Sequence, residues 1–300
     1  MAEGRDHNPS RPPLCRIVLV TGKGGVGKTT VAAGLAHACA QRDRSSVFAE
    51  FGDGESGRRV LGKGGPVEHI VIESQQAILR IATELFHSAL LAKVVIGNFA
   101  MRRLLRAAPA IRELAQLECV RLVAVSRPER TIVVDMPATG HGIAWLRVPA
   151  QLRDMLRTGP LFTIADRLTR ELVAPGRCSV VVVTLPERLV LLETIELCDA
   201  MARDVGLPPS RLVINRVPAP VPQHSLSEAT RVAHSGSPLA EAAGSLVEAL
   251  ASRDQARGDA MAVLEKATEE LSLDPILLPA AATDPNASEV ATWLLREGAL

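Results

Sequence analysis

The residues best suited to chemistry in this sequence lie in the segment Thr21–Thr30, which reads TGKGGVGKTT. The pattern G-x-x-x-x-G-K-[ST] is typical of a phosphate-binding loop, and its fixed positions hold Gly22, Gly27, Lys28 and Thr29. Glycines let consecutive backbone N–H groups approach phosphate oxygens, and a helix that begins near Lys28 adds the positive end of its dipole. Because a buried strand pattern precedes the loop and a helical pattern follows it, we favour a phosphate site over a glycine-rich turn without a ligand.

The motif also predicts what each side chain of the loop does. Lys28 is expected to reach the β- and γ-phosphates, the Thr29 hydroxyl to ligate Mg²⁺, and Thr30 to reach the α-phosphate. Lys28 is a catalytic candidate for this reason. The predicted nucleotide contacts of the loop are Gly22, Lys23, Gly24, Gly25, Val26, Gly27, Lys28, Thr29 and Thr30.

A second motif begins at Thr131–Asp135, a strand pattern that ends in a carboxylate. This is the form of a Walker B strand, whose aspartate holds a water molecule bound to Mg²⁺. Thr29 and Asp135 are therefore the predicted metal-site residues. The small residues of 136–142 could approach a γ-phosphate and rearrange when it leaves, and we interpret His141 as a switch residue or partner contact rather than a general base.

The elements that position these motifs are short apolar strands separated by helical patterns. Little alternation of polar residues within the strands indicates burial on both faces, hence a doubly wound α/β domain with a mostly parallel sheet. We predict strands at Arg16–Thr21, Ser46–Phe51, His69–Glu73, Thr131–Asp135, Ser179–Thr184, Arg211–Asn215 and Pro275–Leu278. We expect a disordered lead-in over 1–13 and one domain over 14–300. A helical insert is expected at about 74–125, and a second helical segment, broken near His234–Pro238, at about 218–271.

Composition excludes several other classes of protein. Lys and Arg number 34 against 33 for Asp and Glu in 300 residues, and aromatic residues make up 2%. Neither a nucleic-acid partner nor a base-stacking surface is expected from such a chain. The five cysteines are widely spaced and form no CxxC pair, so we expect reduced thiols rather than a zinc site. No apolar run is long enough to span a membrane, which favours a cytoplasmic protein.

The loop sequence GKGGVGKTT resembles the deviant Walker A motif of the MinD/ParA, nitrogenase iron-protein and ArsA group. In that group the first lysine reaches across a dimer interface to the nucleotide of the partner. The resemblance therefore implies a P-loop NTPase fold, a homodimer, and a catalytic role for Lys23. The alternative for Lys23 is a solvated loop charge.

Later segments resemble the ArsA family of anion-pump ATPases, whose relatives target tail-anchored membrane proteins. They are DMPATGHG from Asp135, TLPE from Thr184 followed by Glu193-Thr194, Leu212–Arg216, and Ile276–Pro279. The resemblance spans roughly residues 14–285 and implies ATP and Mg²⁺ as ligands. It also implies that Asn215 and Pro279 contact adenine, although an asparagine after a strand is also a common turn residue.

The sequence departs from this family after its second strand. Family members carry an acidic run of the type D-x-D-P-A-H, whereas here Glu50 takes the first acidic place, Gly52 the second, and Asp53 follows one residue later. We predict that Asp53 positions the attacking water. The alternative is that Asp53 is an exposed acidic residue of a turn with no catalytic role. The family's cysteine motifs are also missing, so neither arsenite transport nor tail-anchor targeting carries over.

The resulting prediction is an ArsA-like ATPase that binds Mg²⁺·ATP as a homodimer and couples hydrolysis to a conformational switch. The segment Ser74–Val125 either forms a groove for a protein client or membrane-protein partner, or covers the sheet and dimer interface. A nucleotide-binding switch or scaffold with little turnover is the alternative function. A partitioning ATPase of MinD/ParA type is disfavoured because Glu289–Leu300 has too few basic residues for a membrane-anchoring helix.

Overall fold

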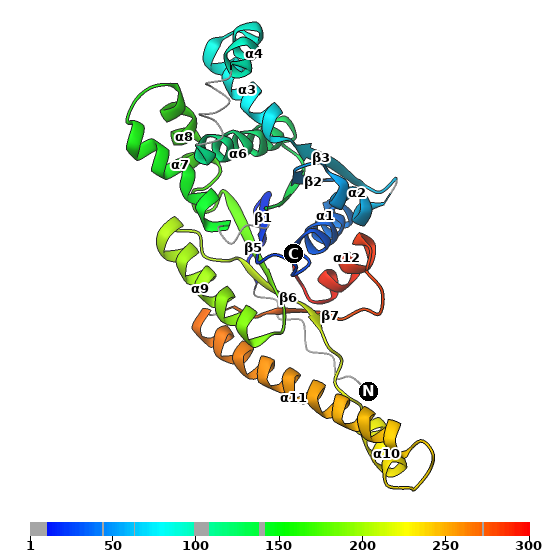
Figure 1. The fold of residues 1–300 in the computed structure, drawn as a ribbon. Helices are drawn as coiled ribbons and strands as arrows, with labels where there is room; N and C mark the ends of the chain where they lie inside the picture. Colours follow the sequence, from blue (N-terminus) through cyan, green and yellow to red (C-terminus); the bar gives the residue numbers. More distant parts are fainter. Residues whose placement is uncertain (1–10, 44, 63, 99–107, 138–141, 272) are drawn as a thin grey trace.

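The computed structural model describes residues 11–43, 45–62, 64–98, 108–137, 142–271 and 273–300. Within them, all strands join one seven-stranded parallel sheet in the order β3-β2-β4-β1-β5-β6-β7 (Figure 1). The strands are β1 (Ile17–Thr21), β2 (Ser46–Phe51), β3 (Val67–Ile72), β4 (Thr131–Asp135), β5 (Cys178–Thr184), β6 (Arg211–Val217) and β7 (Ile276–Pro279). This confirms the predicted α/β class and every predicted strand, with ends shifted by at most two residues.

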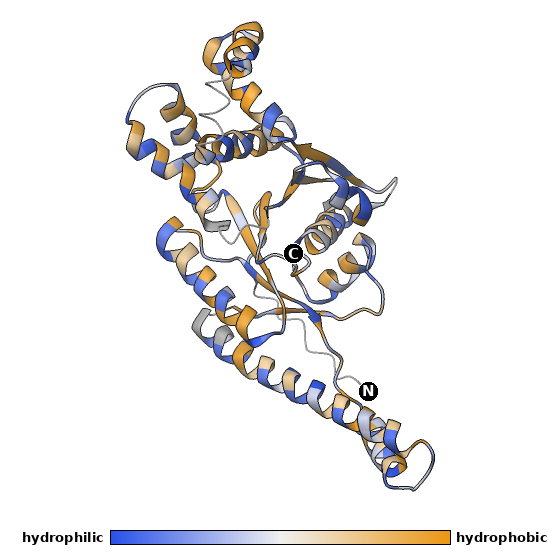
Figure 2. Cartoon of the chain, viewed as in Figure 1, coloured by the Kyte–Doolittle hydropathy of each residue, from blue (hydrophilic) through white to orange (hydrophobic). Residues whose placement is uncertain are grey.

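Helices cover both faces of the sheet, which explains why the strands are apolar without alternation (Figure 2). Val18 and Val20 of β1 pack with α1 (Lys28–Asp43) and α12 (Ala287–Arg296), whereas Ile17 and Leu19 pack with the helices of the opposite face. The opposite layer contains α6 (Pro109–Ser126), α7 (Gly142–Leu156), α8 (Pro160–Glu171) and α9 (Arg188–Val205). The short α2 (Glu55–Leu61) lies beside α1 and β3.

The predicted helical insert consists of α3 (Ser74–Phe86), α4 (Ala89–Gly97) and α6, while residues 99–107 lie outside the described part of the chain. Helix α6 lies against the sheet, since Leu114, Leu117 and Val120 are fully buried in the core. Helices α3 and α4 extend from α6, and the side chains Leu90, Leu91 and Val94 of α4 are exposed. The segment therefore supplies both a sheet-covering layer and an apolar outer surface.

A buried charge cluster joins α6 to its neighbours. Glu118 is 1% exposed and accepts hydrogen bonds from Arg121, three residues further along α6, and from Arg167 of α8. Arg121 also pairs with Glu171, which is 51% exposed. Because Glu118 is the shared acceptor, its loss would leave two partly buried cations without their inner partner.

The second predicted helical segment is a hairpin of α10 (Gln223–Ala233) and α11 (Ala240–Leu271) between β6 and β7. The turn between them lies at the predicted place. Ala260 and Leu264 of α11 are buried against the body, and the other end of the hairpin extends away from the sheet (Figure 1). Across the described ranges, none of the helices is both apolar and long enough to cross a bilayer.

The start of the described chain is attached to the body of the domain. Arg11 forms an ion pair with Asp274 and donates to the carbonyl of Gly298, and the carbonyl of Pro12 accepts from buried Arg211. Residues 1–10 lie outside the described ranges, and the lead-in over 1–13 stays a prediction. The five cysteines all lie within the described ranges and form no disulfide, and burial raises the pKa of Cys178 and of Cys198 to about 12.

Candidate functional site

The glycine-rich loop joins the carboxyl end of β1, the central strand, to the first turn of α1. Gly22 has φ +146°, and a Cβ atom there would lie 2.1 Å from the carbonyl oxygen of Val183 on the neighbouring strand β5. Gly27 has φ +87° immediately before the helix. Both positions require glycine, because an L side chain would meet backbone at one and an unfavourable backbone conformation at both.

Lys28 lies inside the loop rather than in solvent. Its side chain is buried, and Nζ donates a hydrogen bond to the carbonyl oxygen of Lys23 at 3.0 Å. Burial lowers the pKa of Lys28, while the carboxylate of Asp135 raises it. The loop therefore encloses one ammonium group whose charge is balanced by one carboxylate on the adjacent strand.

Thr29 and Asp135 meet between the first turn of α1 and the end of β4. The Thr29 hydroxyl donates to Asp135 Oδ2 at 2.6 Å, and Asp135 Oδ1 is buried without a hydrogen-bond partner among the described residues. Burial raises the pKa of Asp135 to about 6, opposed by the Thr29 hydrogen bond and the Lys28 charge and assisted by Glu50. Mg²⁺ prefers such hard oxygen donors, so an unpartnered carboxylate oxygen beside a hydroxyl fits this ion.

The two acidic residues Glu50, near the end of β2, and Asp53, just after it, have different environments. Asp53 is exposed, and its Oδ1 accepts a hydrogen bond from the backbone N–H of Glu55 at 3.0 Å. In this conformation its side chain therefore stabilises the turn that contains it. Glu50 is 4% exposed and accepts from the backbone N–H of Gly57 and from His69 Nε2. A water-positioning role for Asp53 stays a prediction. The sequence analysis did not identify His69 as a partner of Glu50. The closely spaced glycines after Glu50 are a sequence signal that the backbone packs closely against this side chain.

Asn215 lies against the phosphate loop. Its Nδ2 donates to the carbonyl oxygen of Val26 at 2.9 Å, and its Oδ1 accepts from the backbone N–H of Arg216. Arg216, the next residue, has φ +58° and lies at a shift in the β6–β7 register. Pro279 is exposed at the end of β7, opposite Val217. The structure therefore brings Asn215 to the loop, with Pro279 on the next strand.

Lys23 is directed along the surface instead of into the loop. Its Nζ pairs with Glu193 Oε2 of α9 at 2.5 Å, and both side chains are about half exposed. On the same helix, Leu189 and Leu192 are 74% and 42% exposed. Such exposed ion pairs contribute roughly 0–1 kcal/mol, so little holds Lys23 in this position.

The segment after Asp135 is described only in part. Met136 is buried and its N–H donates to the carbonyl of Val20, which fixes the strand end beside β1. Residues 138–141, including His141, lie outside the described residues, and the description resumes with α7. The switch interpretation of this segment stays a prediction.

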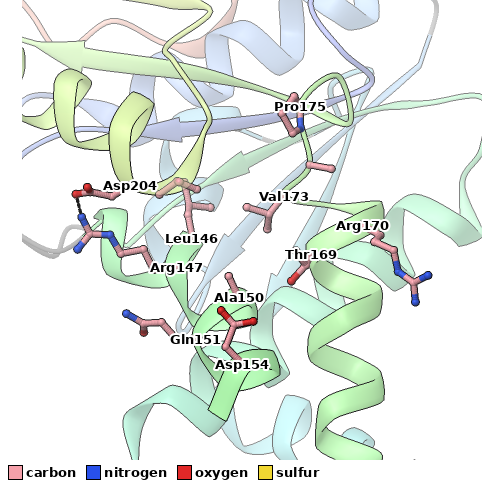
Figure 3. Close-up of a pocket in the computed structure, with 12 residues that line it drawn as sticks. Leu146, Arg147, Ala150, Gln151, Asp154, Thr169, Arg170, Val173, Pro175 and Asp204 are labelled. Atoms are coloured by element: carbon pink, nitrogen blue, oxygen red, sulfur yellow. Dashed lines mark hydrogen bonds and ion pairs between the residues drawn. The ribbon is translucent and has the colours of Figure 1, made fainter. Parts of the chain in front are cut away.

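A separate pocket of about 730 Å³ lies between α7, the segment after α8 and the end of α9 (Figure 3). Leu146, Ala150 and Val173 form its apolar wall, and Arg147 pairs with Asp204 at its rim. Because its loop residues precede β5, the pocket lies towards the amino ends of the strands. The phosphate loop follows the carboxyl end of β1, so this pocket is not part of the predicted site.

Together, a parallel sheet, a phosphate loop after its central strand and a Thr29–Asp135 pair at the carboxyl edge define a P-loop nucleotide-binding protein. The chain matches the CobQ/CobB/MinD/ParA nucleotide binding domain over residues 17–241 and belongs to that family. This confirms the predicted fold and the broader group implied by the deviant loop sequence.

Several relatives are named as ATPases. ATPase BagA of Mycobacterium tuberculosis is 27% identical over 244 residues, which cover 74% of this chain and 71% of BagA. A Mycobacterium bovis protein that is also named as an ATPase matches with the same identity and coverage. An uncharacterized protein of Streptomyces coelicolor is 32% identical over 152 residues, covering 47% of this chain and 39% of that protein.

Proposed function

We propose that this chain is an ArsA-like ATPase that binds Mg²⁺·ATP at residues 22–30 and couples its hydrolysis to a conformational switch. The observation that carries the proposal is the hydrogen-bonded Thr29–Asp135 pair, with a buried unpartnered carboxylate oxygen beside the enclosed ammonium of Lys28. A site of this kind has donors for phosphate on one side and oxygen ligands for a divalent cation on the other.

Each part of the site would act on charge and position. The loop amides and Lys28 would bind the phosphates, and Thr29 and Asp135 would hold Mg²⁺, which neutralises charge on the phosphates when bound. The Asn215 amide would face the purine, because among the described residues its Nδ2 and its Oδ1 each make one hydrogen bond, which leaves one N–H and one lone pair for a base edge. Pro279 would border the base from the next strand.

We propose that the active form is a homodimer in which Lys23 acts on the partner's nucleotide. The weak, half-exposed pair with Glu193 can be exchanged for a phosphate contact at low cost. Exposed Leu189 and Leu192 beside it would be covered by the second copy. A cation supplied in this way stabilises the charge of the transferring phosphoryl group, as an arginine finger does.

The coupled output would be a change in the helices that follow the switch segment. Helix α7 begins directly after residues 136–141, so a rearrangement there would move it relative to α6 and α8. The exposed apolar side chains of α4 would then be the surface offered to a protein client or membrane-protein partner.

A nucleotide-dependent scaffold with little turnover is the second candidate. The observation in its favour is the placement of Asp53, whose carboxylate caps the Glu55 amide in an exposed turn. If no other group orients water, ATP would bind and stay intact.

The test is ATP hydrolysis by the purified chain with and without Mg²⁺, with size-exclusion chromatography and light scattering in ATP. Removal of Lys28 or Lys23 in Lys28→Ala and Lys23→Ala should lower kcat by about 100-fold or more, while exposed Lys93→Ala serves as the control for loss of a lysine. Mg²⁺-dependent turnover by a particle of twice the chain mass supports the proposal. Tight ATP binding without turnover supports the scaffold.

A further inference from the structure

The carboxylate of Glu50 is buried under the first turn of α2. The Gly57 N–H donates to both of its oxygens at 3.1 Å, and His69 Nε2 lies 2.6 Å from Oε1. His69 sits on β3 beside Phe48 of β2, so the strand pairing places its ring next to Glu50. Three different elements, β2, β3 and α2, therefore meet at one carboxylate.

Helix α2 can approach this carboxylate only because it has a glycine there. A Cβ atom on Gly57 would lie 2.3 Å from Glu50 Oε1 and 2.7 Å from His69 Nε2. At the start of the helix, Gly54 has φ +77°, and a Cβ there would lie 2.3 Å from Val71 Cγ2. The helix is thus seated on the polar pair by close contact of its backbone, with its positive end towards the carboxylate.

The same turn carries Asp53 and begins at the end of β2, which pairs with β4, the strand that carries Asp135. Glu50 is the register partner of Asp135 across β2 and β4, so the two carboxylates leave neighbouring strands at the same level. Arg58 of α2 donates to the carbonyl oxygen of Asp53 at 2.8 Å. Glu50 therefore holds the turn 52–57 at Gly57, and Arg58 of α2 holds it at Asp53.

We propose that Glu50, supported by His69, is the positioning residue of this turn: it seats α2 and thereby sets Asp53 relative to the Thr29–Asp135 metal site. The inference rests on the proposed ATPase function. The role differs from a purely structural one because Glu50 is the register partner of Asp135 at the carboxyl edge of the sheet. Among the described residues, the hydrogen bonds to its buried carboxylate come from the Gly57 amide of α2 and from His69.

Hydrogen exchange of the α2 amides and steady-state kinetics test the proposal on the full chain, with Glu55→Gln as the control on an exposed residue of α2. Mg²⁺·ATP should slow exchange over residues 54–61 in the wild type and in Glu50→Gln, whose amide oxygen can still accept from Gly57. In Glu50→Ala this slowing should be lost, and kcat should fall by about tenfold or more with ATP affinity within about threefold of the wild type.

Several results would overturn the proposal. It fails if Glu50→Ala retains both kcat and the slowing of exchange, or if it weakens Mg²⁺·ATP binding by more than about tenfold, which is the behaviour of a ligand-binding residue. It also fails if Glu50→Gln loses as much turnover as Glu50→Ala, since hydrogen bonding alone would then not explain the effect. A wild type without turnover refutes the proposed hydrolysis instead, and the exchange result still decides the role of Glu50.

Discussion

Replacement of Asp135 by the isosteric asparagine tests the charge balance of the proposed metal site directly. In the ligand-free chain the buried carboxylate has a hydrogen bond on one oxygen and no partner on the other. Asp135→Asn keeps the size of the side chain and an oxygen that can accept from Thr29. It removes the buried charge, so it should stabilise the ligand-free fold near neutral pH while abolishing the response to Mg²⁺.

The expected magnitude follows from the pKa of Asp135, which burial raises from 3.8 to about 6. Between these values the folded chain binds more protons than the unfolded chain, so the free energy of unfolding falls as pH rises through this window and stays low above it. A pKa difference of about two units, at about 1.4 kcal/mol per unit, limits the loss of unfolding free energy from the ionised Asp135 to about 3 kcal/mol. The new buried amide costs about 1 kcal/mol, so a net gain of about 1–2 kcal/mol is expected for Asp135→Asn at pH 7.5.

The assay is urea unfolding of both proteins at a series of pH values between 4.5 and 7.5, without nucleotide or Mg²⁺. The difference in unfolding free energy between variant and wild type should increase with pH, because the other titrating groups are shared and cancel. Asp154→Asn is the control, since that side chain is 69% exposed and should change stability by less than about 0.5 kcal/mol throughout. A difference that does not change with pH would refute the raised pKa of Asp135.

Three further outcomes follow from the contacts of single residues. Gly22→Ala should abolish ATP binding measured by calorimetry, because the new Cβ would lie 2.1 Å from the backbone oxygen of Val183. Glu118→Ala should lower the urea unfolding free energy by about 3–5 kcal/mol, whereas the same change at exposed Glu171 should cost at most about 1 kcal/mol. Lys23→Ala should leave the melting temperature nearly unchanged, since its pair is half exposed, so a loss of activity would report on catalysis rather than folding.

The sheet was predictable because its strands are buried on both faces. A continuous run such as that of β5 has few alternatives in a soluble α/β protein, and the loop motif fixes which strand comes before the first helix. The Thr29–Asp135 contact was predictable for the same reason. The carboxyl ends of adjacent parallel strands meet at one edge of the sheet. An aspartate at the end of such a strand can therefore be placed near the phosphate loop from the sequence.

Contacts that depend on exact pairing could not be predicted in this way. His69 reaches Glu50 only because β2 and β3 pair with Phe48 opposite His69, and no local pattern specifies that register. The orientation of Asp53 depends on α2, a helix of seven residues that has too little periodicity to be identified from sequence. The partner of Lys23 on α9 likewise depends on how two distant elements pack.

The central claim is that residues 22–30 bind the phosphates of ATP together with Mg²⁺, and isothermal titration calorimetry tests it most directly. We predict saturable heat when Mg²⁺·ATP is added to the folded wild type, and loss of that heat in Lys28→Ala at the same protein concentration. Absence of any heat with the wild type, under conditions where its circular dichroism and cooperative unfolding show a folded chain, would contradict the account.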